Sequence, residues 1–125
     1  GRLQILCRSR AAVLVQSSSP DGGTTWSPIE KTRLPNPNSG TDAVTLDSGL
    51  HLLIYNPTTK GRTPLELAFS SDGQEWRRLA VLESQPGEYS YPTVIQTRDG
   101  QIHGTYTWKR QRVRHYTLAP PRPAK

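Results

Sequence analysis

The sequence is poor in cysteine and contains no methionine. Its single cysteine, Cys7, excludes an internal disulfide framework and a metal site built from several cysteines. No apolar run is long enough to cross a bilayer, and the first residues lack the layout of a signal peptide. Because Gly1–Arg8 already has a strand-like pattern and no initiator methionine is present, we interpret the N-terminus as a truncation, which leaves the localisation of the protein open.

Apolar residues are also scarce. They make up 33% of the 125 residues, while proline and glycine number 11 and 10. This composition favours a turn-rich, all-β chain with a modest core. No segment shows helical periodicity, and the prolines spread from position 28 to position 92 would interrupt any long helix. The sequence therefore predicts strands and turns throughout its length.

Positive charge exceeds negative charge. The chain has 16 Lys and Arg against 10 Asp and Glu, a net charge of +6, and from Arg98 onward seven basic residues accompany one acidic residue. A basic surface attracts phosphate backbones, acidic glycans and anionic lipids alike, so charge selects only the sign of the partner. The alternating Arg110, Arg112 and Arg114 favour a solvated outer strand face whose charges protect a sheet edge. Since no aromatic residues are interleaved there for stacking on bases, we predict neither a nucleic-acid nor a membrane partner.

A repeat of about fifty residues runs through the chain. The segment Ser19–Trp26 recurs in shortened form as Ser70–Trp76, with the two aspartates 51 positions apart. Three apolar-rich segments also begin with glycines that are spaced 48 and 51 residues apart, at Gly1, Gly49 and Gly100. Gly, Pro, Asn and Asp clusters divide the middle repeat into four short strands, at Ala43–Leu46, Leu50–Tyr55, Leu65–Ser70 and Arg78–Leu82. Four strands at this period are typical of a propeller blade.

The repeated Ser-x-Asp motif suits a hairpin between the last two strands of such a unit. Its aspartate accepts hydrogen bonds from N–H groups of its own turn, its glycine takes a positive φ angle, and its tryptophan packs back between strands. We therefore interpret both copies as structural rather than catalytic. Their residues are Ser19, Asp21, Gly23 and Trp26 in the first copy and Ser70, Asp72 and Trp76 in the second.

Ser19–Trp26 resembles the Asp-box of the sialidase superfamily, whose members carry BNR repeats. The order of the following motifs is similar to that in the C-terminal third of a sialidase: Asn56-Pro57, Arg62–Leu65, Ser70–Trp76, Glu88–Ser90 and Asp99-Gly100. The resemblance extends to about Leu118 and implies an all-β partial β-propeller, with two to three four-stranded blades of a six-bladed sialidase-like propeller. It divides the chain into the end of one blade, a complete blade, the start of the last blade and a Pro-rich disordered tail, at residues 1–35, 36–84, 85–118 and 119–125.

The resemblance also implies a site for an acidic sugar. Sialidases hold the substrate carboxylate with three arginines and attack with a tyrosine that a glutamate assists, while an aspartate serves as acid and base. By resemblance, Arg8 and Arg62 bind the carboxylate and Tyr89 is the nucleophile, with Arg10 an alternative to Arg8 because alternation puts both on one strand face. Guanidinium groups pair with a carboxylate through two parallel hydrogen bonds, and sialidases are the tyrosine exception among glycosidases. The third arginine, the aspartate and the glutamate have no counterpart in this chain.

We therefore expect a C-terminal fragment of a sialidase-like exo-glycosidase that acts on terminal acidic sugars, with an acidic glycan or another carbohydrate as its partner. In isolation it should be inactive, because Glu88 points to the opposite strand face from Tyr89 and no other local base activates the phenol. A lectin-like carbohydrate-binding propeller and a glycoside hydrolase of different specificity are the alternatives. No cofactor is expected, and His51, His103 and His115 lack metal-ligand spacing. Open blade edges predict self-association.

Overall fold

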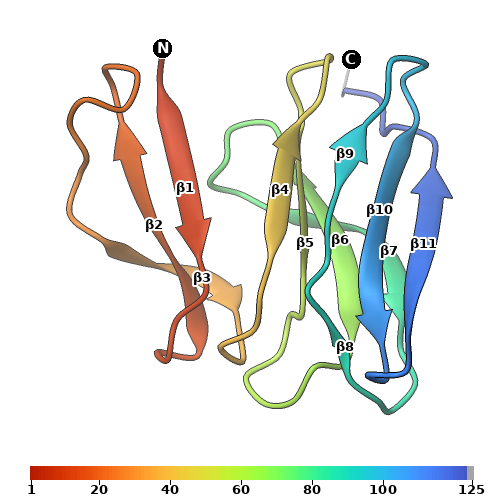
Figure 1. Ribbon diagram of the computed structural model, residues 1–125. Coiled ribbons are helices and arrows are strands. Elements are labelled where there is room, and N and C mark those ends of the chain that lie inside the picture. The colour runs from red at the N-terminus through yellow and green to blue at the C-terminus, as the bar shows by residue number, and fades with distance from the viewer. Residues whose placement is uncertain (124–125) are drawn as a thin grey trace.

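The computed structural model describes residues 1–123 and consists of strands joined by turns (Figure 1). In chain order the strands of this range are β1 (Leu3–Cys7), β2 (Val13–Ser19), β3 (Glu30–Pro35), β4 (Asp42–Thr45), β5 (His51–Tyr55), β6 (Leu65–Ser70), β7 (Arg77–Glu83), β8 (Tyr89–Ser90), β9 (Ile95–Gln96), β10 (Ile102–Trp108) and β11 (Arg112–Leu118). Helices are absent from the described residues, and with them any helix that could span a membrane. The predicted all-β class is confirmed.

The strands form three small sheets that stand side by side (Figure 1). The first has the order β1-β2-β3, the second β4-β5-β6-β7, and the third β11-β10-β8, with β9 also pairing with β10. All neighbouring strands are antiparallel. The four strands predicted for the middle repeat are confirmed as β4 to β7, with ends that differ by at most one residue.

The central strands of the second sheet are buried on both faces. β5 and β6 carry apolar residues at successive positions, and nearly all of these side chains are buried. β7 and β11, at the edges of their sheets, are mostly exposed or half-buried. Because a strand covered on both faces needs apolar residues at consecutive positions rather than at alternate ones, this short apolar run places β5 and β6 at the centre of the molecule.

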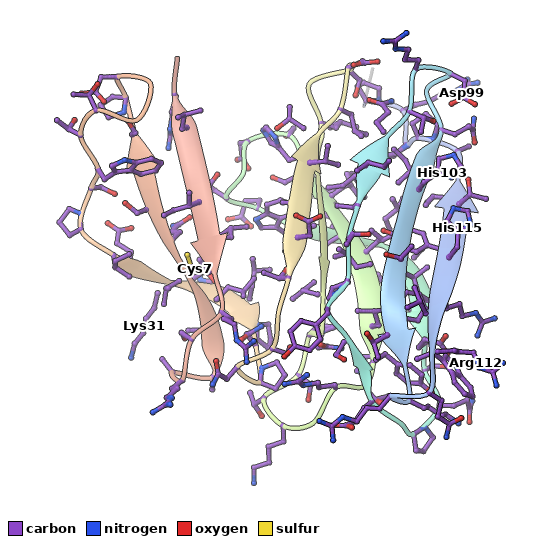
Figure 2. All side chains as sticks on the ribbon, viewed as in Figure 1. Cys7, Lys31, Asp99, His103, Arg112 and His115 are labelled. Carbon is purple, nitrogen blue, oxygen red and sulfur yellow. The ribbon has the colours of Figure 1, made fainter. Side chains whose placement is uncertain are left out.

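Two apolar cores flank the second sheet, and side chains extend into the spaces between the sheets (Figure 2). Since successive side chains on β5 point to opposite faces, Leu52 and Ile54 enter one core, and Leu53 and Tyr55 enter the other. Each fully buried leucine or isoleucine contributes about 1.5–3 kcal/mol, so the larger core stabilises the second and third sheets most. That core comprises Leu46, Leu50, Leu52, Ile54, Leu65, Leu67, Tyr89, Val94, Ile102 and Tyr106, and the smaller one comprises Leu14, Leu53, Tyr55 and Ala68.

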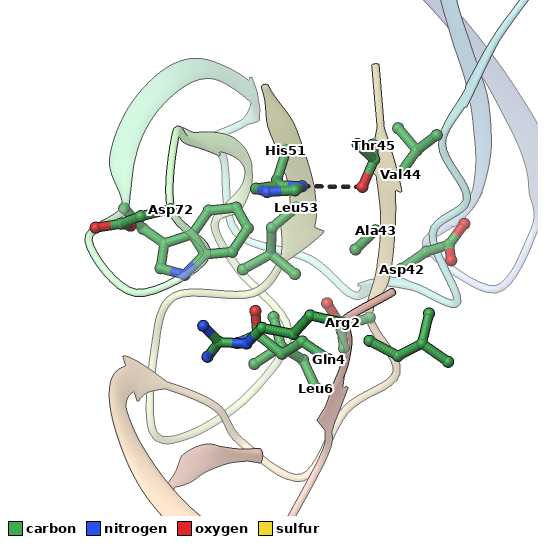
Figure 3. A pocket seen from close by; sticks show the side chains of 13 residues that line it. Arg2, Gln4, Leu6, Asp42, Ala43, Val44, Thr45, His51, Leu53 and Asp72 are labelled. Atoms are coloured by element: carbon green, nitrogen blue, oxygen red, sulfur yellow. Dashed lines mark hydrogen bonds between the residues drawn. The ribbon is translucent and has the colours of Figure 1, made fainter. Parts of the chain in front are cut away.

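A groove of about 500 Å³ separates β1 from β4 and β5 (Figure 3). Gln4 of β1 and His51 of β5 contribute to its lining, and His51 Nδ1 lies 2.9 Å from the hydroxyl of Thr45. Leu3 and Ile5 of β1 are 46% and 41% exposed. Among the described residues β1 pairs only with β2, whereas β5 and β10 are paired on both sides. β1 is therefore an open edge with apolar side chains beside it.

The repeated Ser-x-Asp turns make the predicted hydrogen bonds. Asp21 Oδ1 accepts from the backbone N–H of Thr25 at 2.8 Å, and Asp72 Oδ1 accepts from two backbone N–H groups of its own turn at 2.8 and 3.0 Å. The hydroxyl and N–H of Thr25 lower the pKa of Asp21 to about 2. These contacts tie each aspartate to its own turn.

The tryptophans of the two turns differ, which corrects one prediction. Trp76 packs against the smaller core, as expected of a side chain that returns between strands. Trp26 is 43% exposed, and its indole N–H donates to the Gly23 carbonyl of its own turn at 3.1 Å. The physical reason is that Trp76 of the second sheet packs against the first sheet. Trp26 lies in the β2–β3 connection of the first sheet itself, and the described residues contain no further sheet to cover it.

Candidate functional site

Several chain connections meet at one end of the molecule, the lower end in Figure 1. The connections β1–β2, β3–β4, β5–β6, β7–β8 and β10–β11 all turn there (Figure 1). Arg8 follows β1, Asn38 lies between β3 and β4, Arg62 lies between β5 and β6, and Tyr91 follows β8. Residues from three different sheets and their connections can therefore converge at this end, although they are far apart in sequence.

Arg8 is held by Asn38. The Arg8 Nε donates to Asn38 Oδ1 at 3.0 Å, and Arg8 Nη2 donates to the Asn38 carbonyl oxygen. Asn38 has a φ angle of 57°, a left-handed conformation that asparagine tolerates better than most residues. This conformation brings the side-chain and backbone oxygens of one residue to one guanidinium. Arg10 is exposed in the β1–β2 turn, so the structure favours Arg8 over Arg10 as the arginine of this cluster.

Tyr91 lies beside Arg62 and within reach of the charge of Arg8. Tyr91 is 61% exposed, and Arg62 Cζ lies 5.5 Å from the centroid of the Tyr91 ring. Hydrogen bonding by Arg62 and then by Arg8, reinforced by their positive charges, lowers the pKa of the Tyr91 phenol. Arg8 and Arg62, which are 54 positions apart in sequence, thus meet at one phenol group.

Tyr89, the predicted nucleophile, lies in the core instead. The residue is 1% exposed and belongs to the larger apolar core, and its hydroxyl is 3.5 Å from the Pro86 carbonyl oxygen. Its backbone N–H donates to the Arg62 carbonyl at 3.1 Å. A buried phenol cannot reach a sugar at the surface in this conformation, so Tyr89 supports the Arg62 loop from below. The exposed phenol at the arginines belongs to Tyr91, which the sequence reasoning missed.

A local change of backbone direction explains why the Tyr89 side chain is buried and the Tyr91 side chain is exposed. Tyr89 and Tyr91 are two positions apart and would share one face of a regular strand. Tyr91 has a φ angle of 51°, which is unusual for a bulky residue and separates its side chain from that of Tyr89. The only sequence signal is Pro92, since the residue before a proline is conformationally restricted, and this signal does not predict a left-handed conformation.

A buried polar network lies beneath the cluster. Asn36, Ser39 and Asn56 are 0% exposed. The Ser39 hydroxyl donates to Asn56 Oδ1 at 2.8 Å, and Asn56 Nδ2 donates to the carbonyl oxygens of Pro64 and Tyr89, each at 3.0 Å. The network therefore joins the β3–β4 connection to the segments that carry Arg62 and Tyr91. The sequence motif Asn56-Pro57 was recognised, but its role as a link between loops was not.

Carboxylates of the neighbouring strands are engaged elsewhere. Glu88 Oε2 lies 3.5 Å from Arg110 Nε. Glu83 Oε2 accepts hydrogen bonds from the Tyr106 hydroxyl at 2.5 Å and from Arg114 Nη1 at 3.1 Å. Among the charged groups of the described residues, only the two arginines shift the pKa of Tyr91. The cluster is therefore cationic and suited to an anion, and it has no acid or base of its own besides the phenol.

Residues 1–123 contain no group of three or more His, Cys, Asp or Glu side chains arranged to hold a metal ion. His103 Nδ1 and His115 Nε2 lie 3.0 Å apart on neighbouring strands, and Figure 2 shows the two rings side by side. The end of the chain after Leu118 has no regular structure as far as residue 123. The last two residues of the predicted tail, 124–125, lie outside the described residues.

Comparisons with known proteins agree with this architecture. A family model described as a BNR repeat-like domain matches residues 1–103. The structure is similar to that of the leech intramolecular trans-sialidase, with a TM-score of 0.79, 15% identity and 95% of this chain covered. It is equally similar to the intramolecular trans-sialidase from Ruminococcus gnavus, with a TM-score of 0.79, 18% identity and 95% coverage. A Hadza microbial sialidase gives a TM-score of 0.77 at 18% identity and 95% coverage. No curated protein matches the sequence.

The chain spans only 22%, 30% and 25% of the length of these three proteins, respectively. At such low identity the likeness concerns the fold. It confirms the prediction of an all-β fold that matches part of a sialidase propeller.

Proposed function

The chain belongs to the family of BNR repeat-like domains, and from this premise we propose that it is part of a sialidase-like exo-glycosidase acting on terminal acidic sugars. The observation that carries the proposal is the meeting of Arg8 and Arg62 at Tyr91. Two guanidinium groups suit the carboxylate of an acidic sugar, because each can form paired charge-assisted hydrogen bonds with it. The relatives named above are sialidases and trans-sialidases, which supports this substrate class.

Within this proposal Tyr91 takes the role first assigned to Tyr89. A phenol attacks more readily as its pKa falls toward the working pH, and the ordinary value of tyrosine is about 10. The phenolate oxygen would bond to the anomeric carbon as the bond to the leaving oxygen breaks, and water would then release the sugar. The leaving oxygen needs a proton from an acid, and the cluster offers none. We therefore propose that the rest of a longer protein supplies the acid, and that this chain alone is inactive.

A carbohydrate-binding role without cleavage is the second candidate. It is favoured by one observation, that Arg62 and Arg8 lower the pKa of the Tyr91 phenol and that no carboxylate of residues 1–123 is among the groups that shift it. A propeller of this kind would hold an acidic glycan at the same arginines. A glycoside hydrolase of another specificity shares the same requirement for an acid and a base outside the cluster.

The binding step can be measured on this chain. Isothermal titration with N-acetylneuraminic acid should show binding that is lost with its methyl ester, because esterification removes the negative charge. Arg8→Gln and Arg62→Gln should each weaken binding about tenfold or more, as one charge-assisted hydrogen bond contributes about 1.5–3 kcal/mol. Arg10→Gln removes the same charge from the same β1–β2 connection and should change affinity little. Equal binding of acid and ester would refute the carboxylate site.

Turnover distinguishes the two candidates. A fluorogenic sialoside should be hydrolysed by a full-length protein that contains this chain and not by the chain itself. In the full-length protein, Tyr91→Phe should abolish hydrolysis and spare ligand binding. Tyr89→Phe, which removes a buried hydroxyl, should leave hydrolysis largely intact in the folded fraction. Loss of activity in the Tyr89 variant but not in the Tyr91 variant would return the role to Tyr89, and binding without any hydrolysis would support the lectin-like alternative.

A further inference from the structure

The β10–β11 turn lies next to the segment that carries Arg62. The backbone N–H of Lys109 donates to the Glu88 carbonyl at 2.8 Å, and the N–H of Tyr89 donates to the Arg62 carbonyl at 3.1 Å. Arg62 and Glu88 also form a parallel bridge. Neighbouring extended segments lie about 4.8 Å apart. The backbone at Lys109 is therefore about 10 Å from the backbone at Arg62, which is two such spacings. The turn therefore extends the surface that carries the arginine cluster.

Three basic residues lie in or beside this turn, and the side chains of two of them lie over the Trp108 ring. Lys109 Nζ lies 4.6 Å and Arg112 Cζ 4.8 Å from the Trp108 ring, and Figure 2 shows Arg112 at the same end of the molecule. Arg110 lies in the turn itself, not on the strand face that its alternation with Arg112 and Arg114 predicts, because β11 begins only at Arg112. We call Trp108, Lys109, Arg110 and Arg112 the Trp108 ledge.

The charges of the Trp108 ledge are oriented but only partly neutralised. An aromatic ring attracts a cation without cancelling its charge, so Lys109 and Arg112 stay positive while their positions are restricted. Arg110 pairs with Glu88 at 3.5 Å, with the two side chains 80% and 50% exposed, and such an exposed pair contributes little. Among the three cations of the ledge, only Arg110 forms an ion pair with a carboxylate of the described residues, that of Glu88.

The backbone of the turn supplies independent evidence. Lys109 and Arg110 both have positive φ angles, of 49° and 55°. A turn with two such residues strongly prefers Asn-Gly, which adopts this conformation without strain. Lys109 and Arg110 therefore occupy positions where their side chains make the turn less stable than Asn-Gly would. Strained conformations of this kind are concentrated at binding sites, where the side chain rather than the backbone is needed.

We propose that the Trp108 ledge is a second anion-binding subsite, which takes a carboxylate or sulfate on the sugar next to the one held at Arg8 and Arg62. This inference rests on the proposed function, because the first sugar must occupy the arginine cluster. It specifies the substrate class as a glycan with acidic groups on neighbouring residues. A glycan with one acidic terminal sugar gains nothing from the ledge.

The test compares two ligands on the full 125-residue chain. Isothermal titration should show that α2,8-linked di-N-acetylneuraminic acid binds more tightly than the monomer, and that the advantage falls with added salt. The double variant Lys109→Asn with Arg110→Gly introduces the preferred turn residues and removes two charges. It should raise the urea midpoint of unfolding, reduce dimer affinity about fivefold, since an exposed ion pair contributes at most about 1 kcal/mol, and leave monomer affinity unchanged.

Arg98→Gln is the matched control, because Arg98 is an exposed basic residue of the β9–β10 turn at the other end of the sheet. It should leave both affinities unchanged. Equal binding of monomer and dimer by the unmodified chain overturns the Trp108 ledge and leaves the proposed function standing. Binding of neither ligand overturns the proposed function and the ledge with it. A short DNA duplex that binds more tightly than the dimer, and loses affinity in the double variant, overturns the glycan assignment in favour of a nucleic acid.

Discussion

Replacing Asn56 by alanine should destabilise the fold directly beneath the arginine cluster. Asn56 is 0% exposed and makes three hydrogen bonds, one accepted from Ser39 at 2.8 Å and two donated to the carbonyls of Pro64 and Tyr89 at 3.0 Å. No buried side-chain nitrogen or oxygen of the described residues lacks a partner. Alanine removes the shared partner of a hydroxyl and two carbonyl groups in a place that water does not reach.

The expected loss in the free energy of unfolding follows from the three polar groups that alanine leaves without a partner. Each buried group left without a partner destabilises a fold by about 1–3 kcal/mol, and some relaxation toward water is expected. We therefore predict a loss of about 3–5 kcal/mol in the free energy of unfolding. A natural domain has only about 5–15 kcal/mol in total. With a urea dependence of about 2 kcal/mol per molar for a small protein, the unfolding midpoint should fall by about 2 M.

Urea denaturation followed by tryptophan fluorescence, repeated at several protein concentrations, measures this loss. Asn56→Asp keeps the size of the side chain but cannot donate to the two carbonyls, so it should be as damaging as alanine. Thr59→Ala, an exposed change in the same loop, should shift stability by no more than about 0.5 kcal/mol. The argument fails if Asn56→Ala costs less than about 1 kcal/mol or behaves like Thr59→Ala.

Three further predictions concern other parts of the fold. Asp21→Asn should lower the melting temperature much more at pH 7 than at pH 2: the pKa of Asp21 is lowered from 3.8 to about 2, so its carboxylate stabilises the fold fully above about pH 4 and loses this effect as the pH falls through 2. Calorimetry at both pH values checks this, and an equally large difference in melting temperature at pH 2 and pH 7 would contradict it. Tyr106→Phe should cost about 1–2 kcal/mol, since the phenol donates to Glu83 at 2.5 Å and burial raises its pKa. Arg114→Gln should cost less than about 1 kcal/mol because Arg114 is 57% exposed, and equal losses on urea denaturation would refute the distinction. Ile5→Lys on the open edge of β1 should weaken the self-association that we predict for this chain. Sedimentation velocity should then give a smaller average mass than for the unmodified chain, and an unchanged mass would exclude the β1 edge as the contact.

The strands and the repeated turns were predictable because their signals are local. The apolar residues of β5 and β6 stand at successive positions, and this pattern reflects burial on both faces. Asp21 and Asp72 bond to the N–H groups of their own turns, so residues a few positions apart contain the whole interaction. The exposure of Trp26 was not predictable, because it depends on which sheet stands beside the first one.

The candidate site depended on contacts that no local pattern records. Arg8 and Asn38 are 30 positions apart, and their hydrogen bonds exist because the β1–β2 and β3–β4 connections turn at the same end. The choice between Tyr89 and Tyr91 depends on a φ angle of 51° after β8, which directs one phenol outward while the other stays in the core. The Trp108 ledge likewise requires that β10 pair with β8 beside the Arg62 loop.

By itself, the sequence determined the all-β class, the period of the repeat and the strands of the middle unit, because strand burial and turn chemistry depend on residues a few positions apart; it also predicted Arg8 and Arg62 of the proposed site. Only the tertiary structure decided which tyrosine faces the arginines and what holds them. These choices depend on loops from different sheets meeting at one end, and on the buried Asn56 network that fixes their relative positions.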